Sequence, residues 1–168
     1  MALQRGFTLI ELLVVLVIIA LFTGMVMLNV NSNDNKVLAR EATRLIHLIE
    51  LAEDEAILQG IELGLSIQAD RYRFMRLHEK KWLPLTTDRE FKEHTLDATI
   101  RMSVEIENDG IIHSQNKASA LPDVVILSSG ELTPFHITLF SEASPSQTYE
   151  LSGLANGQLS LQSEHSDY

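Results

Sequence analysis

The spacing of apolar positions changes along this chain, and each change marks a different kind of element. From Phe7 to Leu28 nearly every residue is apolar, and Glu11 is the only ionisable side chain among the 22. As an α-helix such a stretch extends about 33 Å, enough to cross a hydrocarbon core of about 30 Å. A helix that is apolar on all sides is typical of a membrane span, because a surface helix keeps one polar face. The pattern predicts a transmembrane helix over residues 7–28.

The next segment, Asn29 to Asn35, is polar and rich in asparagine, which favours local side-chain hydrogen bonds over helix. We therefore expect a break or bend there, with a new helix capped at Asn33 or Asp34. From Lys36 to Gln59 the apolar residues recur at spacings of three and four, which predicts one amphipathic helix that ends at Gly60. The apolar stripe consists of Leu38, Ala42, Leu45, Ile49, Ala52 and Ala56. The opposite face carries Arg40, Glu41, Arg44, Glu50, Glu53, Asp54 and Glu55, and we interpret it as solvated, with contact to a neighbouring subunit as the alternative.

Beyond Gly60 the apolar runs become short and turn residues separate them, which is typical of strands. The predicted strands are Ile61 to Ile67, Tyr72 to Leu77, Thr99 to Ile106, Val124 to Leu127, Phe135 to Phe140, Tyr149 to Leu151 and Gln158 to Leu161. Asn108-Asp109-Gly110 and Ala155-Asn156-Gly157 suit hairpin turns. The predicted fold class is α+β, with a long N-terminal helix, membrane-spanning in its first half and amphipathic in its second, packed on a largely antiparallel β-sheet head.

Charge and composition narrow the function classes. The net charge is −10, and from Met102 to Tyr168 there are nine acidic residues against one basic residue, Lys117. An acidic C-terminal half repels phosphate. The basic residues from Arg71 to Arg101 are interleaved with acidic ones, and we interpret them as a solvated mixed surface, with a nucleic-acid patch as the alternative. No nucleic acid is therefore expected as a partner. The chain has no cysteine, which excludes disulfides, thiol catalysis and Cys-ligated zinc.

The sequence shows no catalytic, metal or cofactor motif, so we expect no enzyme, no metal and no cofactor. The histidines His47, His78, His94, His113, His136 and His165 are scattered without ligand spacing and are interpreted as surface or strand-edge residues. A nucleophile elbow and a glycine-rich phosphate loop are both missing. Trp82 is interpreted as a core residue, with an exposed recognition aromatic as the alternative.

The flanks of the apolar run indicate its orientation. Arg5 lies just before the run, and no Lys or Arg follows until Lys36, so the N-terminus should stay cytoplasmic and the head should lie outside. Residues 21–28 read LFTGMVML, without the small-residue pattern of a secretory cleavage site. Conventional removal of the whole segment is therefore not expected.

The hexapeptide Gly6 to Glu11, GFTLIE, resembles the signature of the type IV pilin and pseudopilin family. The resemblance implies cleavage by a prepilin peptidase after Gly6 and methylation of the new N-terminal amine on Phe7. It also implies the layout of the chain: a leader over residues 1–6, a transmembrane and assembly helix over 7–28, and a periplasmic head over 29–168. Within that head the amphipathic helix covers about 36–59 and the β-rich part 61–168.

Glu11 has a physical reading as well. A carboxylate within an apolar span costs about 3 kcal/mol, so it should pair, lie near an interface or be protonated. Cleavage after Gly6 creates an amine at Phe7, four residues away, which can pair with Glu11 within a helix or between helices. We therefore assign Glu11 to assembly, with a glutamate that snorkels to water as the alternative.

A second segment, Ser128 to Phe135, reads SSGELTPF and resembles the C-terminal segment of H-type minor pseudopilins of the type II secretion system and of FimT-like minor pilins. By itself it predicts a Ser-Gly turn followed by a proline at the start of a strand, without a binding role.

The resemblance implies a minor pseudopilin, a structural subunit near the tip of the type II secretion pseudopilus that helps to drive export of folded proteins across the outer membrane. Its implied partners are other minor and major pseudopilins, the inner-membrane assembly platform, the prepilin peptidase/methyltransferase and the lipid bilayer. Its implied location is the bacterial inner membrane, single-pass with a periplasmic head, and the pseudopilus after assembly. The alternatives are a minor pilin of a type IV pilus or DNA-uptake filament, and an ordinary single-span protein with a periplasmic sensing head.

Overall fold

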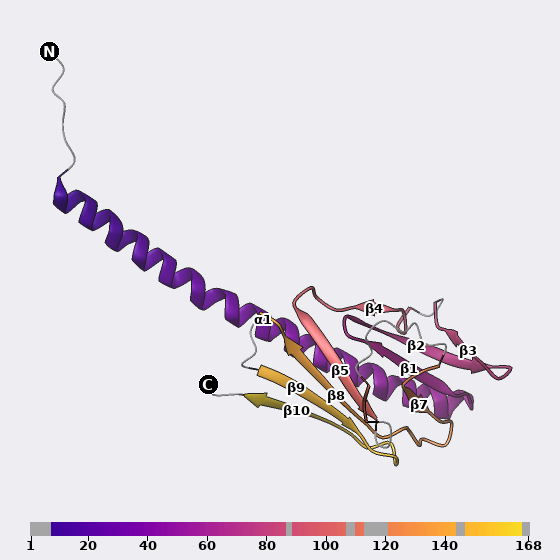
Figure 1. Ribbon diagram of the computed structural model, residues 1–168. Coiled ribbons are helices and arrows are strands. Elements are labelled where there is room, and N and C mark those ends of the chain that lie inside the picture. The colour runs from indigo at the N-terminus through magenta and orange to yellow at the C-terminus, as the bar shows by residue number, and fades with distance from the viewer. Residues whose placement is uncertain (1–7, 87–88, 107–109, 113–120, 144–146, 166–168) are drawn as a thin grey trace.

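The structure, a computed structural model, describes residues 8–86, 89–106, 110–112, 121–143 and 147–165, and within these the side chains of 23–33, 110–112 and 165 are outside the description. One long helix projects from the head with its N-terminal half and lies against two antiparallel sheets with its C-terminal half (Figure 1). The predicted α+β class, a helix packed on antiparallel sheet, is confirmed.

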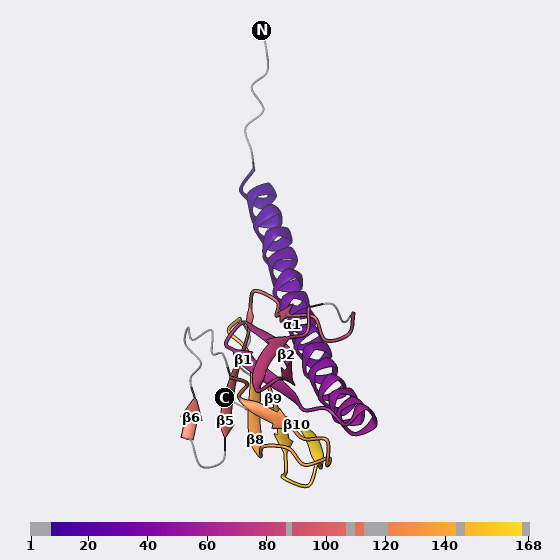
Figure 2. The ribbon, with the colours of Figure 1, turned by 90° about the vertical axis from the view of Figure 1, so that its right-hand side faces the viewer.

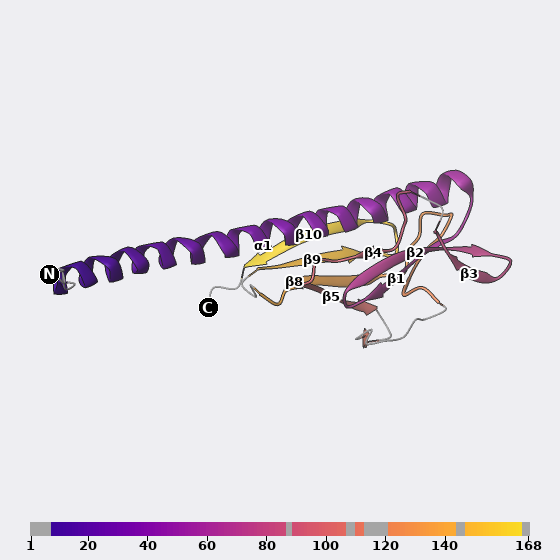
Figure 3. The same ribbon diagram turned by 90° about the horizontal axis from the view of Figure 1, so that it is seen from above.

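Helix α1 runs from Leu9 to Gln59 without interruption over 51 residues. The break expected at Asn29 to Asn35 is therefore wrong, as the unbroken ribbon in Figure 3 also shows. Each Asn, Ser or Asp costs a helix interior at most about 0.7 kcal/mol relative to alanine. A break would instead leave two more helix ends with unpaired backbone groups and require a second nucleus.

The end of α1 follows the prediction. Gly60 adopts the left-handed conformation with φ 65°, and its N–H donates to the carbonyl of Ala56. A residue without Cβ accepts this conformation readily, which makes Gly60 an ordinary helix stop. The predicted apolar stripe is also confirmed, because all six of its side chains are 0% exposed.

The first sheet follows directly from the helix and has the strand order β3-β2-β1-β7, with β4 also paired to β2. Its strands are β1 Leu63–Gln68, β2 Arg71–His78, β3 Lys81–Pro84, β4 His94–Thr95 and β7 Val124–Ile126. Strands β1, β2 and β7 were predicted, whereas β3 and β4 were not. Trp82 lies in β3 and is half-buried, so it is neither a full core residue nor a freely exposed aromatic.

The second sheet has the order β10-β9-β8-β5-β6, with all neighbours antiparallel. Its strands are β5 Ile100–Ile106, β6 Gly110–Ile112, β8 Phe135–Ser141, β9 Gln147–Gly153 and β10 Leu159–His165. Figure 2 shows this sheet spread beside α1, with β6 and β10 at its two ends. The helix contacts β8, β9 and β10, so its apolar stripe covers one face of the sheet.

Both predicted hairpins pair as expected. Strands β5 and β6 meet at Ile106 and Gly110, although residues 107–109 of that turn are outside the described part. In the β9–β10 turn the N–H of Leu154 donates to Gln158 at 3.0 Å, and Gly157 is left-handed with φ 85°. Sheet and helix enclose one hydrophobic core, whose largest fully buried side chains include Tyr72 and Phe74 of β2 and Phe135 of β8.

Candidate functional site on the projecting helix

The projecting half of α1 begins at a capped end. Thr8 has an extended backbone with φ −84° and ψ 150°, and its hydroxyl accepts from the backbone N–H of Glu11 at 3.4 Å. Its carbonyl also accepts from the N–H groups of Glu11 and Leu12, at 3.1 and 3.3 Å. Thr8 is therefore the N-cap, the residue type that best pairs the free donors of a helix start.

Glu11 occupies the first turn of this helix. A threonine cap followed three residues later by glutamate is the capping-box pattern. The N-terminus of a helix carries partial positive charge, so a carboxylate in the first turn is stabilised there. Glu11 thus lies at the end of the helix where a second positive group, such as an N-terminal amine, could pair with its carboxylate.

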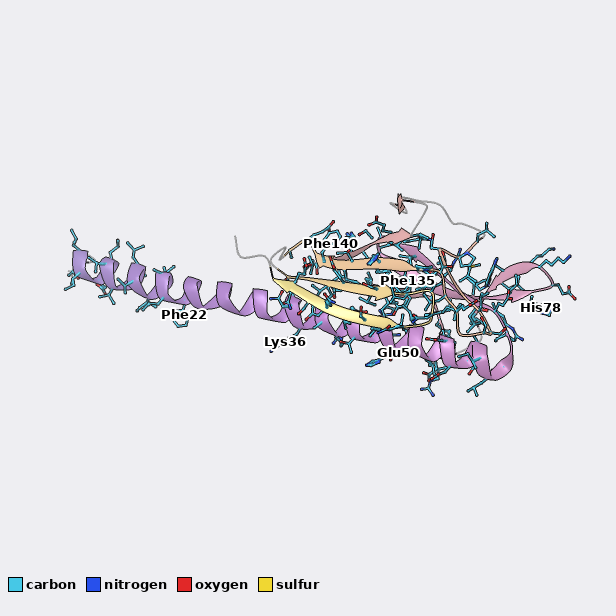
Figure 4. All side chains as sticks on the ribbon, turned by 90° about the horizontal axis from the view of Figure 1, so that it is seen from below. Phe22, Lys36, Glu50, His78, Phe135 and Phe140 are labelled. Carbon is cyan, nitrogen blue, oxygen red and sulfur yellow. The ribbon has the colours of Figure 1, made fainter. Side chains whose placement is uncertain are left out.

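From Leu9 to Phe22 the projecting helix exposes apolar side chains on both sides of Glu11. Twelve large hydrophobic residues are between 45% and 86% exposed: Leu9, Ile10, Leu12, Leu13, Val14, Val15, Leu16, Val17, Ile18, Ile19, Leu21 and Phe22. Figure 4 shows Phe22 on the part of α1 that stands clear of the head. Apolar surface of this extent marks a site of contact with lipid or protein.

Within the described part of the chain, no helix is both long and apolar enough to cross a membrane. The span predicted from Phe7 to Leu28 includes Phe7 and the side chains of residues 23–28, which are outside the description. The cleavage residues Gly6 and Phe7 are outside it as well, so cleavage and methylation stay predictions.

At the other end of α1 the SSGELTPF segment supports the helix. The N–H of Gly130 donates to Leu127, and that of Leu127 donates to Glu131, which closes the predicted Ser-Gly turn. A Cβ on Gly130 would lie 3.3 Å from Cδ1 of Ile57, so the turn packs closely on α1. The segment therefore positions the helix against the head.

Glu53 lies beside this turn. Burial, followed by the neighbouring charges of Asp54 and Glu50, raises the pKa of its carboxyl. A Cβ on Gly157 would overlap the Glu53 carboxylate, so the β9–β10 hairpin also reaches this turn of the helix. Glu53 is half-buried between two glycine turns, and the fully solvated face expected for it is not found.

A hydrogen-bonded pair between the helix and the first sheet was missed by sequence reasoning. Glu41 was expected on the solvated face, but it is only 7% exposed, and its Oε2 lies 2.8 Å from Nε2 of His94 in β4. The ring of His94 packs against Tyr72 with centroids 5.3 Å apart. Burial raises the pKa of Tyr72 to about 12, while the nearby cation of Arg44 opposes the shift and Glu41 adds to it. No motif spacing signals a pair separated by 53 positions.

The remaining histidines fit the surface interpretation as far as they are described. His47 pairs with Glu50 at 2.9 Å on the exposed face of α1, and His78 and His136 are exposed in strands. His113 and the side chain of His165 are outside the described residues. No cluster of three or more metal-ligating side chains occurs in the described part of the chain.

Two further carboxyls have shifted pKa values with structural causes. Hydrogen bonds from the Arg71 guanidinium lower the pKa of Asp70 in the β1–β2 turn. Burial raises the pKa of Asp123, although its Oδ2 accepts from the N–H of Ile67 at 2.7 Å. The Asp70 pair lies within one turn, whereas Asp123 ties the loop before β7 to strand β1.

Comparison with known proteins identifies the family. A family model described as the prokaryotic N-terminal methylation motif matches residues 1–27. A second, described as type II transport protein GspH, matches residues 41–157, which is more than half of the chain.

Curated relatives agree with this match over nearly the whole length. The type II secretion system protein H of Pseudomonas aeruginosa is 35% identical and covers 89% of this chain and 90% of its own. The protein of the same name from Escherichia coli K12 is 31% identical over 81% of this chain and 80% of its own.

Solved structures share the fold. The minor pseudopilin EpsH from the type 2 secretion system of Vibrio cholerae superposes with a TM-score of 0.61 and 26% identity, covering 74% of this chain and 94% of that one. The solution structure of E. coli GspH gives a TM-score of 0.58 at 25% identity over 74% of this chain and 87% of the other. The chain therefore belongs to the GspH family of type II transport proteins, which are minor pseudopilins, structural subunits of a secretion system and not enzymes.

Proposed function

We propose that this chain anchors in the bacterial inner membrane through the projecting half of α1 and then enters the type II secretion pseudopilus near its tip. The observation that carries the proposal is the apolar surface from Leu9 to Phe22, which the head leaves uncovered. In the membrane this surface contacts lipid, and in the filament it contacts helices of other major and minor pseudopilins. The filament then helps to drive folded proteins across the outer membrane.

Maturation precedes assembly. The leader, residues 1–6, is cleaved after Gly6 by the prepilin peptidase, and the new amine on Phe7 is methylated. The match of residues 1–27 to the N-terminal methylation motif supports this step. Thr8, the cap of α1, directly follows the proposed new terminus, so cleavage leaves the helix start intact.

The amine created at Phe7 gives Glu11 its role. Glu11 sits in the first turn of α1, on the same end of the helix as the new terminus. Charge-assisted hydrogen bonds between a carboxylate and an amine are about twice as strong as neutral ones, and more so where lipid or protein excludes water. We therefore assign Glu11 to pairing with the Phe7 amine of this subunit or of a packed neighbour.

The proposed topology is single-pass, with residues 7–28 in the inner membrane and the head, residues 29–168, in the periplasm. The assembly platform would extract the subunit from the bilayer. Relatives named as secretion proteins favour a secretion filament over a pilus or DNA-uptake filament.

The test is Glu11→Leu, with Glu50→Leu as a matched exposed glutamate on the head half of the same helix. Wild type and both variants should be recovered from the membrane fraction, and intact-mass analysis of the extracted protein should show that all three begin at Phe7, with a methyl group on the wild type. Cross-linking of Glu11→Leu to other pseudopilins should fall about tenfold, because one charge-assisted pair is lost. Glu50→Leu should assemble and secrete normally.

Two results contradict the proposal. A mature chain that still begins at Met1 in a host with active prepilin peptidase removes the maturation step. If Glu11→Leu inserts, cross-links and secretes at wild-type levels, Glu11 has no role in assembly.

A further inference from the structure

The four sheet edges of the head are protected unequally. Strand β3 is four residues long and contains both Lys81 and Pro84, two residue types that block strand addition. Strand β7 is covered by the following loop, since Thr133 N–H donates to Val125 at 2.9 Å and Leu132 bridges to Ile126. Strand β6 spans only three residues.

Strand β10 lacks these protections. It is seven residues long, contains no Pro, Lys or Arg, and pairs with β9 in unbroken register from Leu159 to His165, so no bulge turns it away. Within the described residues no strand pairs with its other side. Figure 4 shows β10 from the side on which no other element lies over it.

The ladder fixes which backbone groups face that free side. The N–H of Leu154 donates to Gln158 at 3.0 Å and closes the hairpin, so hydrogen-bonded and non-bonded pairs alternate from there. Ser160, Gln162 and Glu164 therefore bond to β9, by register with Ser152, Glu150 and Thr148. Leu159, Leu161 and Ser163 direct their N–H and C=O groups to the open edge.

The surroundings of the edge select the chemistry of an added strand. Glu164 of β10 and Glu150 of β9 lie on the sheet face turned away from the core. On the other face Leu159 and Leu161 are partly buried against the core. A fitting strand has basic side chains toward the carboxylates and apolar ones toward α1. A second copy of this chain fits poorly, because its own β10 edge is equally acidic.

We infer that the β10 edge accepts an extended, basic segment of another subunit of the secretion filament, which adds to this sheet as a sixth strand. Main-chain hydrogen bonds to Leu159, Leu161 and Ser163 supply the attachment, and the carboxylates set the partner's charge. This inference rests on the proposed function, because it adds a contact between heads to the contact between helices.

The experiment uses the full chain in its secreting host. Because the chain has no cysteine, Gln162→Cys introduces a single thiol beside the open edge. Glu105→Cys is the matched control, an exposed position of the same sheet on interior strand β5. After treatment with a cross-linker that carries a maleimide and an amine-reactive ester, which joins the introduced thiol to a lysine of the basic partner, we expect a heterodimer with another pilin-class subunit, identified by mass spectrometry, from Gln162→Cys and not from Glu105→Cys.

A second substitution tests the backbone contact itself. Adding Ser163→Pro to Gln162→Cys removes one outward N–H without touching the β9 ladder, whereas Ser163→Ala keeps it. The heterodimer should fall about fivefold with proline and stay unchanged with alanine, because one backbone hydrogen bond is lost. If the proline variant fails to fold, the contrast between positions 162 and 105 decides alone.

The inference is overturned by a homodimer at position 162, or by equal heterodimer yields from Gln162→Cys and Glu105→Cys. It is also overturned by the absence of any product at position 162 in filaments that Glu11-dependent cross-linking shows to be assembled. That last result leaves the proposed function standing. A wild-type chain that does not cross-link to other pseudopilins refutes the proposed function separately.

Discussion

At the scale of single residues, the support of α1 depends on positions where a side chain cannot be added. Gly130 and Gly157 come from different loops, and both lie against the same turn of the helix around Glu53 and Ile57. Both have positive φ, 83° and 85°, which other L-residues adopt only with strain. Because these two residues lack a side chain, both turns can pack closely against the helix.

Gly157→Ala should destabilise the head by about 2–4 kcal/mol, from left-handed strain plus overpacking. Its Cβ would overlap the Glu53 carboxylate and approach the carbonyl of Gly130 to 2.7 Å. Gly60→Ala is the control, since it has φ 65° but nothing within 4 Å, and should cost only about 1 kcal/mol. Urea unfolding measures both, and equal losses would show that crowding at Gly157 has no effect.

The raised pKa of Tyr72 predicts a loss of stability at alkaline pH. Its pKa is about 10 in the unfolded chain and is raised to about 12 in the head, so the folded state favours the neutral phenol. This contribution is fully present below pH 10 and is lost as the pH rises to 12, about 3 kcal/mol in all. Tyr72→Phe should remove that loss. Unfolding free energies at pH 8 and pH 12 test it, and an identical pH dependence in both proteins would contradict it.

The buried pair of Glu41 and His94 shows where residue-level prediction failed. Glu41 borders the apolar stripe beside Leu38, Ala42 and Leu45, and periodicity alone could not tell whether its carboxylate reached water or a partner. The answer depends on β4, a two-residue strand that carries His94 to the helix. Only the tertiary structure brings the two groups together.

At the scale of elements, the strands with alternating or continuously apolar residues were predictable, and those formed by pairing alone were not. Strands β5 and β8 alternate buried and more exposed residues, and β1 is buried almost throughout. Strands β3 and β4 are short, and mostly exposed or half-buried. They form because β2 offers its edge to both, which the sequence does not display.

The continuous helix is the main correction at this scale, and it predicts a distance. Spin labels on cysteines introduced at the exposed positions Ile18 and Arg40 are separated by 22 residues, about 33 Å along an unbroken helix. Double electron–electron resonance on detergent-extracted protein should give one narrow distribution near that value. A broad or clearly shorter distribution would show that the helix bends at Asn29 to Asn35. A pair of labels at Arg40 and Leu58, both within the head half, serves as the rigid reference.

At the scale of the whole molecule, α1 divides two tasks between its halves. The C-terminal half buries six side chains completely in the head, whereas the described N-terminal half leaves its large apolar side chains bare. The sequence indicated both halves, because one shows a stripe and the other is apolar all round. The candidate site residues Gly6 and Phe7 came from a family signature, and Glu11 came from that signature and from the cost of a carboxylate within an apolar run. Packing in the head could not have identified any of them.

This division predicts that the head folds without the projecting half. A chain that begins at Asn29 keeps every member of the core, since the first buried stripe residue is Leu38 and the sheets begin at Leu63. It should be monomeric in solution and unfold cooperatively. Among the residues removed, the described side chains from Leu9 to Phe22 are largely left uncovered by the head. The melting temperature should therefore differ from that of the detergent-extracted full chain by less than about 4 °C, the shift that roughly 1 kcal/mol produces in a domain of this size. Chelator should leave the melting temperature unchanged, because the described side chains form no metal-ligating cluster.

Calorimetry with and without chelator is the measurement. Leu45→Ala, which empties a fully buried position, is the positive control and should lose about 2–5 kcal/mol. A head that unfolds without residues 1–28, or that loses stability on chelation, would show that the projecting half or a metal contributes to the core.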